Sequence, residues 1–170
     1  MPEIIDLYNN ARQIVRTAEK HEPIPDGLNK VAVHIWVVNS KGEFLLQQRL
    51  ATAKKLPNMW GQIGGGVQTG ETSWDACVRE CSEEMGLTPT LENSILVGTW
   101  KRLNDFVDVW LVYSDVNVND LKLQPSEVQN AKWASRQDIE QMQQNGTFIP
   151  SILPGLKMVY AYLDMLQQRK

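Results

Sequence analysis

The sequence is poor in the residues that hold small disulfide-rich folds or zinc sites together. Among 170 residues there are only two cysteines and two histidines, too few cysteines for a disulfide framework, and a zinc site would need more ligands near the two cysteines. Cys77 and Cys81 lie four residues apart and share one face if that segment is helical. We interpret them as reduced packing residues of a cytoplasmic protein.

Strong charge and long apolar runs are also missing. The net charge of -3 creates no positive field to attract a nucleic-acid polymer or an anionic membrane. No apolar run approaches the roughly 20 residues that span a bilayer, and the N-terminal residues lack a signal-peptide pattern. Hydrophobic residues make up 42% of the chain, enough for one domain with a sizeable core. We therefore expect a single cytoplasmic domain, residues 1–170, without nucleic-acid or membrane partners.

The first residues of the chain predict a β-hairpin. Segments 3–8 and 13–18 read as strands, and the turn-forming pair Asn9-Asn10 lies between them. A helix over residues 9–20 is the alternative interpretation.

After a proline-rich connector the chain alternates between strands and helices. Its patterns predict strand pairs at 31–38 with 42–49 and at 95–102 with 106–116, a short strand after Gly61, a last strand at 128–135, and helices at 136–145 and 152–168. This order of elements belongs to the α/β class. His34 lies inside the first of these strands, where a packed or edge histidine is a commoner role than a ligand.

Three acids dominate the middle of the chain. Glu80, Glu83 and Glu84 have the spacing i, i+3, i+4, which places their carboxylates on one face of a helix. Three like charges so close repel one another unless cations bind between them. Magnesium and manganese prefer oxygen ligands, and magnesium commonly bridges carboxylates and phosphates. The acids therefore predict one half of a metal–phosphate site.

The neighbouring residues predict a helix at this place. Thr72 and Asp75 resemble a capping box, and Gly86 stands where helices often end in a left-handed cap. We expect an apolar face roughly opposite the acids, formed by Trp74, Cys77, Val78, Cys81 and Met85. Four glycines precede the helix, at positions 64, 65, 66 and 70. Glycine permits backbone conformations closed to other residues, so this segment can approach a phosphate or offer carbonyls to a metal.

The glycines and the acids together form a longer pattern. From Gly65 the chain reads Gly, five residues, Glu71, seven residues, and then RECSEEMGL over residues 79–87. This resembles the signature of the Nudix hydrolases, with Cys81 at a position where a larger aliphatic residue is usual. The number of matched positions at fixed spacing makes the resemblance specific.

The resemblance implies a fold and an activity. The implied fold is a Nudix-type α/β/α sandwich around a mixed β-sheet, here with an N-terminal β-hairpin extension over 1–27, a core over 28–145 and a C-terminal helix within 146–170. The implied activity is hydrolysis of a diphosphate (pyrophosphate) linkage in a small molecule, usually a nucleoside diphosphate derivative, with Mg2+ or Mn2+ as cofactor. A homodimer is a common arrangement among resembling proteins.

The resemblance also implies roles for individual residues. The implied metal ligands are Glu80, Glu83 and Glu84, with a backbone carbonyl of Gly64 or Gly65, while Glu71 and Arg79 fix the loop against the helix. The run E-V-x-x-x-x-W, which begins at Glu127, resembles the segment whose loop glutamate approaches the metals from outside the motif. Catalytic roles are assigned to Glu83, Glu84 and Glu127, and the sequence leaves open which acid takes the proton from water.

Residues outside the motif are candidates for contact with substrate. Arg49, Lys54 and Lys55 could meet phosphates, although exposed lysines are commonplace. Trp60 belongs either to the core or to a pocket, with the core favoured. Asp108 interrupts an apolar strand and is either a site residue or a solvent-facing strand residue.

Two other functions are weighed against hydrolysis. The general layout is similar to isopentenyl-diphosphate isomerase, but Gly64 and Gly66 stand where such isomerases have a cysteine and a histidine. Pro23 and Lys30 stand at the places of that family's upstream histidine pair. The third class is a catalytically inactive Nudix module that senses a nucleotide, in which the acidic motif would normally have decayed.

Overall fold

The computed structural model describes residues 2–169. Its strands are β1 (Ile4–Tyr8), β2 (Ile14–Glu19), β3 (Lys30–Val38), β4 (Phe44–Arg49), β5 (Trp60–Gly61), β6 (Ile63–Gly66), β7 (Ser94–Arg102), β8 (Asp105–Tyr113) and β9 (Val128–Ala134). Its α-helices are α1 (Ser73–Met85), α2 (Arg136–Gln144) and α3 (Leu153–Gln168). The predicted elements are all present, and the strand expected to run to residue 116 ends at Tyr113.

A mixed β-sheet forms the middle layer, as the sequence predicts. Its order is β5-β4-β3-β8-β7, with β6 paired to β3 and β9 paired to β4. The pair β3–β8 is parallel and the other pairs are antiparallel. The long strand β3 therefore organises the sheet and carries the glycine strand β6 on one of its edges.

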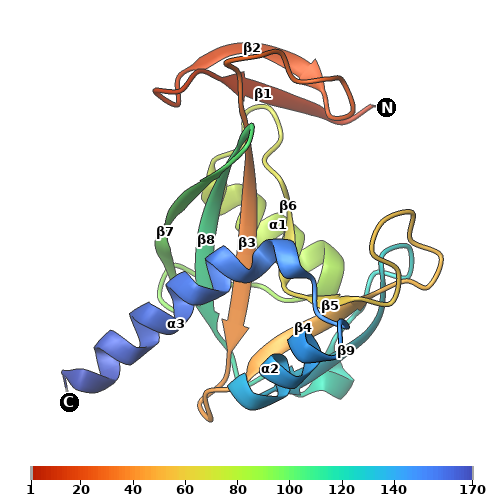
Figure 1. Ribbon diagram of the computed structural model, residues 1–170, viewed down its shortest axis with the longest axis vertical. Coiled ribbons are helices and arrows are strands. Elements are labelled where there is room, and N and C mark those ends of the chain that lie inside the picture. Colours follow the sequence, from red (N-terminus) through yellow and green to blue (C-terminus); the bar gives the residue numbers. More distant parts are fainter. Residues whose placement is uncertain (1, 170) are drawn as a thin grey trace.

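Helices cover both faces of this sheet (Figure 1). Alternate residues of β3 face different cores: Val33 and Ile35 pack on the side of α1, whereas Trp36 and Val38 pack on the side of α2 and α3. This is the α/β/α sandwich predicted above. Among residues 2–169, no helix combines the length and apolar character needed to cross a membrane.

The edge of β3 is shared by two strands. The strand β4 pairs with β3 only at Val37 and Val38, next to the turn, and β6 pairs with residues 32–35. The predicted pairing of 31–38 with 42–49 is therefore correct near the turn. It is wrong farther along the two strands, because β4 leaves β3 to pair with β9. The Gln47 side chain of β4 and the backbone of β6 can then reach a common point beneath the sheet edge.

The N-terminal residues form the predicted hairpin of β1 and β2, and the helix alternative for residues 9–20 is wrong. The hairpin lies across one end of the sheet (Figure 1). It is fastened by Arg12, whose Nη1 donates to Asp108 Oδ1 at 2.8 Å, while Thr99 Oγ1 donates to the same oxygen at 2.6 Å. Burial alone would raise the pKa of Asp108, but the hydrogen bonds from Arg12 and Thr99 outweigh it and the pKa lies below its ordinary value.

Candidate functional site

Local capping fixes where α1 begins and ends. The Thr72 hydroxyl accepts a hydrogen bond from the Asp75 N–H at 3.1 Å, and the Thr72 N–H donates to Asp75 Oδ2 at 2.8 Å, which completes the predicted capping box. At the other end Gly86 has φ 68°, a conformation that few side chains tolerate. Its N–H donates to the Ser82 carbonyl at 3.0 Å. These bonds fix the first and last residues of α1.

The three motif acids do not share one environment. Glu80 and Glu84 are 8% and 4% exposed, whereas the Glu83 side chain is 50% exposed. The expected apolar face opposite the acids is therefore wrong in part: the buried residues of α1 are Ala76, Cys77, Glu80, Cys81, Glu84 and Met85. Two carboxylates lie on the packed side because the glycine strand above them carries no side chains to fill that space.

Gly65 provides that space directly. A Cβ atom at this position would overlap the Glu80 carboxylate, whereas a Cβ at Gly66 would meet nothing within 4 Å. Glycine is therefore required at position 65 because the backbone passes too close to the Glu80 carboxylate for a side chain. The requirement does not come from the backbone conformation of Gly65.

Arg79 connects the acids to the glycine strand. Its Nε donates to Glu71 Oε1 at 2.6 Å, and its Nη2 donates to Glu71 Oε2 at 3.0 Å and to the Gly66 carbonyl at 2.9 Å. Its Nη1 donates to Glu80 Oε1 at 2.7 Å and lies 3.4 Å from Glu83 Oε2. The predicted Glu71–Arg79 contact is present, and Arg79 also reaches two of the motif acids.

Among residues 2–169, Glu84 is held by two neutral donors and by no cation. Gln47 Nε2 donates to Glu84 Oε2 at 2.7 Å, and the Gly64 N–H lies 3.3 Å from the same oxygen. Burial, followed by the negative charge of Glu80, raises the pKa of Glu84 to about 8, although the Gln47 hydrogen bond opposes the rise. The pKa of Glu80 is also raised by burial, against the hydrogen bond from Arg79.

The loop acid Glu127 lies near this cluster. The Gln124 N–H donates to the Glu84 carbonyl at 3.1 Å, so the loop is tied to α1. The charge of Glu127 adds to the causes that raise the pKa of Glu84, which places Glu127 within electrostatic reach of the motif.

The backbone of β6 presents one edge to the acids. Val67 N–H donates to the Val31 carbonyl at 2.9 Å, and Gly65 stands opposite Val33. In an antiparallel ladder the intervening residues direct both backbone groups outward. The Gly64 N–H points outward to Glu84, and the Gly66 carbonyl points outward to Arg79. The Gly64 carbonyl shares this outward edge, whereas that of Gly65 faces β3.

These donors fit a hard divalent cation. Two buried carboxylates beside each other have raised pKa values, so a positive charge between them would relieve both burial and repulsion. Carboxylate and carbonyl oxygens are the ligands that magnesium and manganese prefer. Within residues 2–169, no three His, Cys, Asp or Glu side chains stand close enough together to form a complete ligand set, and Glu80 and Glu83 contact Arg79 instead.

A pocket of about 820 Å3 opens on the Glu127 side of the acids. We call it the basic pocket, because its lining residues include Lys20, His21, Arg49, Lys54, Lys55 and Glu127. The structure therefore brings together the three cations that the sequence nominates for phosphates. It does not bring the other two candidates there. Trp60 packs with the core beneath α2 and α3, and the solvent-facing alternative for Asp108 is wrong because that residue is 1% exposed.

A second cavity, of 240 Å3, lies on the other side of β6. We call it the glycine-side cavity; its polar lining residues are Lys20, Lys30, His34, Gln62 and Arg102, and the glycines of β6 form one wall. Lys20 lines both pockets, and its charge acts on the pKa of Glu80. The acids thus lie between two recesses of different composition.

Sequence reasoning missed several of these residues. Gln47 carried a usable signal, because it follows the core residue Leu45 by two positions and so points to the same buried face of β4. Lys20, Gln62 and Arg102 carried none, since they come from separate elements and meet only through the sheet pairing.

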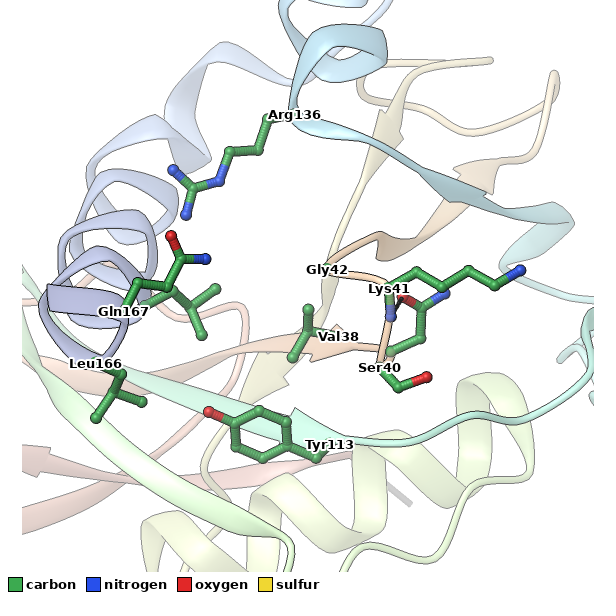
Figure 2. Close-up of a pocket in the computed structure, with 10 residues that line it drawn as sticks. Val38, Ser40, Lys41, Gly42, Tyr113, Arg136, Leu166 and Gln167 are labelled. Carbon is green, nitrogen blue, oxygen red and sulfur yellow. Dashed lines mark hydrogen bonds between the residues drawn. The ribbon is translucent and has the colours of Figure 1, made fainter. Parts of the chain in front are cut away.

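A third depression, of about 480 Å3, lies beyond the C-terminal end of β3 (Figure 2). Its lining includes Lys41, Tyr113, Arg136 and Gln167, and none of the predicted site residues. Arg136 is already paired with Asp164 at 2.7 Å. We assign no chemistry to this depression.

The fold and the acid-lined glycine strand define a Nudix domain, and comparison with known proteins agrees. A family model described as the NUDIX domain matches residues 28–154. An uncharacterized Nudix hydrolase of Listeria innocua is 33% identical over 147 residues, covering 85% of this chain and 87% of the relative. An isopentenyl-diphosphate Delta-isomerase of Shigella flexneri is 29% identical over 144 residues, covering 81% and 79%. The chain belongs to the Nudix hydrolase family.

Solved structures agree on the fold. The crystal structure of DR0079 from Deinococcus radiodurans has a TM-score of 0.75 at 21% identity and covers 91% of this chain and 96% of that one. The NUDIX domain of Shewanella oneidensis NrtR, solved in complex with ADP ribose, has a TM-score of 0.65 at 16% identity and covers 85% and 94%.

The close approach at Gly65 leads to a prediction. In Gly65→Ala the new methyl group must displace the Glu80 carboxylate, the flexible end of a side chain, so we expect the protein to fold but to bind Mn2+ at least about tenfold more weakly. Gly66→Ala, with open space at its Cβ, is the matched control and should keep wild-type Mn2+ affinity. Calorimetric titration with Mn2+ measures both. Equal affinities in the two variants would remove Glu80 from the ligand set.

Proposed function

We propose that this protein is a divalent-metal-dependent hydrolase that splits a diphosphate linkage in a small molecule, with nucleoside diphosphate derivatives as the substrate class. One observation carries the proposal: two buried carboxylates with raised pKa values, Glu80 and Glu84, lie between a glycine strand and a pocket whose lining includes Arg49, Lys54 and Lys55. Such an arrangement is suited to a cation that in turn binds phosphate oxygens.

Under this proposal the three motif acids share the task of binding the metal. Glu80, Glu83 and Glu84 would hold Mg2+ or Mn2+, with the outward carbonyl of Gly64 favoured over that of Gly65. The bound cation would supply neutralisation of phosphate charge and a lower pKa for a bound water. Glu83 is the most exposed of the three, which suits it to meet water and substrate.

The reaction itself is a simple exchange at phosphorus. Water forms a new P–O bond, the bond to the bridging oxygen breaks, and the leaving phosphate keeps that electron pair. The proton released by water passes to a carboxylate. Glu127 is the favoured acceptor, because it lies outside the ion pairs of Arg79 and beside the basic pocket. Arg49, Lys54 and Lys55 would hold phosphate oxygens of the substrate during this step.

The isomerase relatives make one alternative worth testing. Proton transfer to a carbon–carbon double bond needs a well-placed acid. Gly64 and Gly66 have no side chain at the two positions where isomerases of this layout have a cysteine thiol and a histidine imidazole. Hydrolysis needs neither group. The residues present are therefore sufficient for hydrolysis but not for isomerase activity.

Phosphate or nucleotide release from a panel of nucleoside diphosphate compounds, with Mg2+ and with EDTA, tests the proposal. We expect turnover that requires the metal and falls at least a hundredfold in Glu83→Gln, because the amide cannot supply the anionic ligand. Glu92→Gln, an exposed acid outside the site, is the matched control and should keep wild-type turnover.

Three results would contradict the proposal. Hydrolysis that survives both EDTA and the Glu83 substitution would remove the metal mechanism. Conversion of isopentenyl diphosphate to its isomer would establish the alternative. Tight binding of the same compounds without turnover would assign the domain to nucleotide sensing.

A further inference from the structure

The Gln47 side chain is a buried polar group in contact with the acid cluster. Gln47 belongs to β4 and is 8% exposed. Its Nε2 donates to Glu84 Oε2 at 2.7 Å and to the Gln62 carbonyl at 3.0 Å. An amide nitrogen carries two hydrogens. Both are therefore used, one on a motif acid of α1 and one on the backbone that leads into β6.

The orientation of this amide leaves its oxygen without a partner. Gln47 Oε1 is buried and has no hydrogen-bond partner among residues 2–169. The reverse orientation would place this oxygen against the Glu84 carboxylate and the Gln62 carbonyl, which are both acceptors. A buried acceptor without a donor reduces stability and is rare in folded proteins. The two donated hydrogen bonds therefore decide the orientation, although the other end of the amide loses by it.

The donors of Glu84 converge on one of its two oxygens. Gln47 Nε2 and the Gly64 N–H both contact Oε2. Within the described residues 2–169, the other oxygen, Oε1, accepts no hydrogen bond. A carboxylate that is fixed through one oxygen presents the other in a defined direction. Hydrogen bonds of this kind orient the carboxylates that bind metals in proteins.

The two buried acids differ in the charge of their partners. Glu80 accepts a hydrogen bond from Arg79 Nη1 at 2.7 Å, so a cation already compensates part of its charge. The donors of Glu84 are an amide side chain and a backbone N–H, which are both neutral. A metal ion that approaches Glu80 must therefore compete with Arg79. At Glu84 it meets a buried charge that no side chain neutralises, where electrostatic attraction is strong.

We infer that Gln47 is a positioning residue of the metal site. Its amide N–H fixes the Glu84 carboxylate, and because the amide is neutral, the charge of Glu84 stays available to the metal ion. This inference rests on the proposed function, in which Glu84 is a metal ligand. A lysine at position 47 could donate a similar hydrogen bond, but its charge would compete with the metal.

Calorimetric titration of the metal-free protein with Mn2+, without substrate, tests the inference. Gln47→Met keeps the length of the side chain and removes the donor, and we expect Mn2+ to bind at least about tenfold more weakly. Gln47→Lys keeps a donor and adds a positive charge beside Glu84. We expect it to bind Mn2+ more weakly than Gln47→Met by a further factor of about ten. If hydrogen bonding alone mattered, Gln47→Lys would be the tighter binder of the two.

Gln48→Met is the matched control. Gln48 is the next residue of β4 and points to the opposite face of the sheet, where its Nε2 donates to the Asn58 carbonyl at 3.0 Å. This variant should keep wild-type Mn2+ affinity. Thermal unfolding in EDTA shows that each variant folds. Gln47→Met should unfold within about 5 °C of wild type, because it loses the unpaired oxygen together with the donor. If Gln47→Lys does not fold, the comparison of Gln47→Met with Gln48→Met still decides.

Turnover of a diphosphate compound adds a kinetic readout. In Gln47→Met the Mn2+ concentration for half-maximal turnover should rise at least about tenfold. The kcat at saturating Mn2+ should change by less than about threefold, because the metal ligands themselves are all still present. Damage to the packing around the site would lower kcat at every Mn2+ concentration.

The outcomes distinguish the two proposals. Mn2+ affinity that falls in the order wild type, Gln47→Met, Gln47→Lys, without hydrolysis of any diphosphate compound by wild type, overturns the proposed function and supports the role of Gln47. Hydrolysis by wild type with equal Mn2+ affinity in wild type and Gln47→Met overturns the inference and leaves hydrolysis in place. Tighter binding by Gln47→Lys than by Gln47→Met also overturns the inference, and a wild-type protein that binds no Mn2+ overturns both.

Discussion

Glu84→Gln should make the metal-free protein more stable at alkaline pH and abolish its activity. The amide has the shape of the acid and can still accept the hydrogen bond from Gln47, but it carries no charge to be penalised by burial. The folded-state pKa of Glu84, about 8, lies above its ordinary value of 4.5. A raised pKa contributes stability that is complete below 4.5 and is lost as the pH rises through 8.

The size of the effect follows from the two pKa values. A difference of about 3.5 units at about 1.4 kcal/mol per unit gives an upper figure of roughly 5 kcal/mol. Urea unfolding in EDTA at pH 5 and at pH 9 measures it. We expect wild type to lose several kcal/mol between the two conditions and Glu84→Gln to lose much less. Glu92→Gln should follow wild type, and a Glu84→Gln profile parallel to wild type would contradict the burial argument.

The same substitution separates stability from function. With Mg2+ at pH 9, wild type should regain stability because a ligand that binds the folded state stabilises it, while Glu84→Gln should gain little. Its turnover should fall about a thousandfold or more, as expected when an anionic metal ligand is neutralised. A stable and inactive variant would identify Glu84 as a residue kept for chemistry at a cost to the fold.

Arg79→Ala should be among the most destabilising single substitutions in the protein. The Arg79 and Glu71 side chains are each 19% exposed and that of Glu80 is 10% exposed, so removal of the guanidinium leaves two largely buried carboxylates without their cation. Loss of one partner of a buried ion pair costs about 3–5 kcal/mol. The Gly66 carbonyl also loses its donor.

Urea unfolding in EDTA compares Arg79→Ala with two other variants. Arg16→Ala removes an exposed arginine that lies 3.7 Å from Glu22, and it should cost no more than about 0.5 kcal/mol. Arg79→Lys keeps the charge but not the fork of donors, and it should fall between the two. Addition of Mn2+ should recover part of the loss in Arg79→Ala, because another cation then faces Glu80. An Arg79→Ala protein as stable as Arg16→Ala would show that the ion pairs are not a structural requirement.

Local signals in the sequence were reliable where a few adjacent residues decide the structure. The capping box at Thr72 and Asp75, the left-handed residue Gly86 and the turn at Asn9 each depend on neighbours within about four positions. For the same reason the contact of Arg79 with Glu71 could be anticipated, since both belong to one loop and helix.

Predictions from local sequence patterns failed where two segments distant in sequence pack together. The helix pattern alone put all three acids on one polar face, yet Glu80 and Glu84 are buried because the strand packed over them has Gly65 at the point of contact. Asp108 read as a solvent-facing residue in the absence of its partner, and that partner, Arg12, comes from a hairpin 96 positions earlier. No pattern within a single strand contains such information.

The sequence by itself determined the family, the order of elements and the identity of the acidic motif, because these are written in short spacings along one helix and its loop. Only the tertiary structure decided which acids are buried and what surrounds them. Burial depends on the divergence of β4 and β6 from the shared edge of β3, which lets Gln47 and Gly64 reach one carboxylate of α1. The pKa of each acid is therefore set by the packing of β4, β6 and α1 against one another. The sequence of any one of these segments does not determine it.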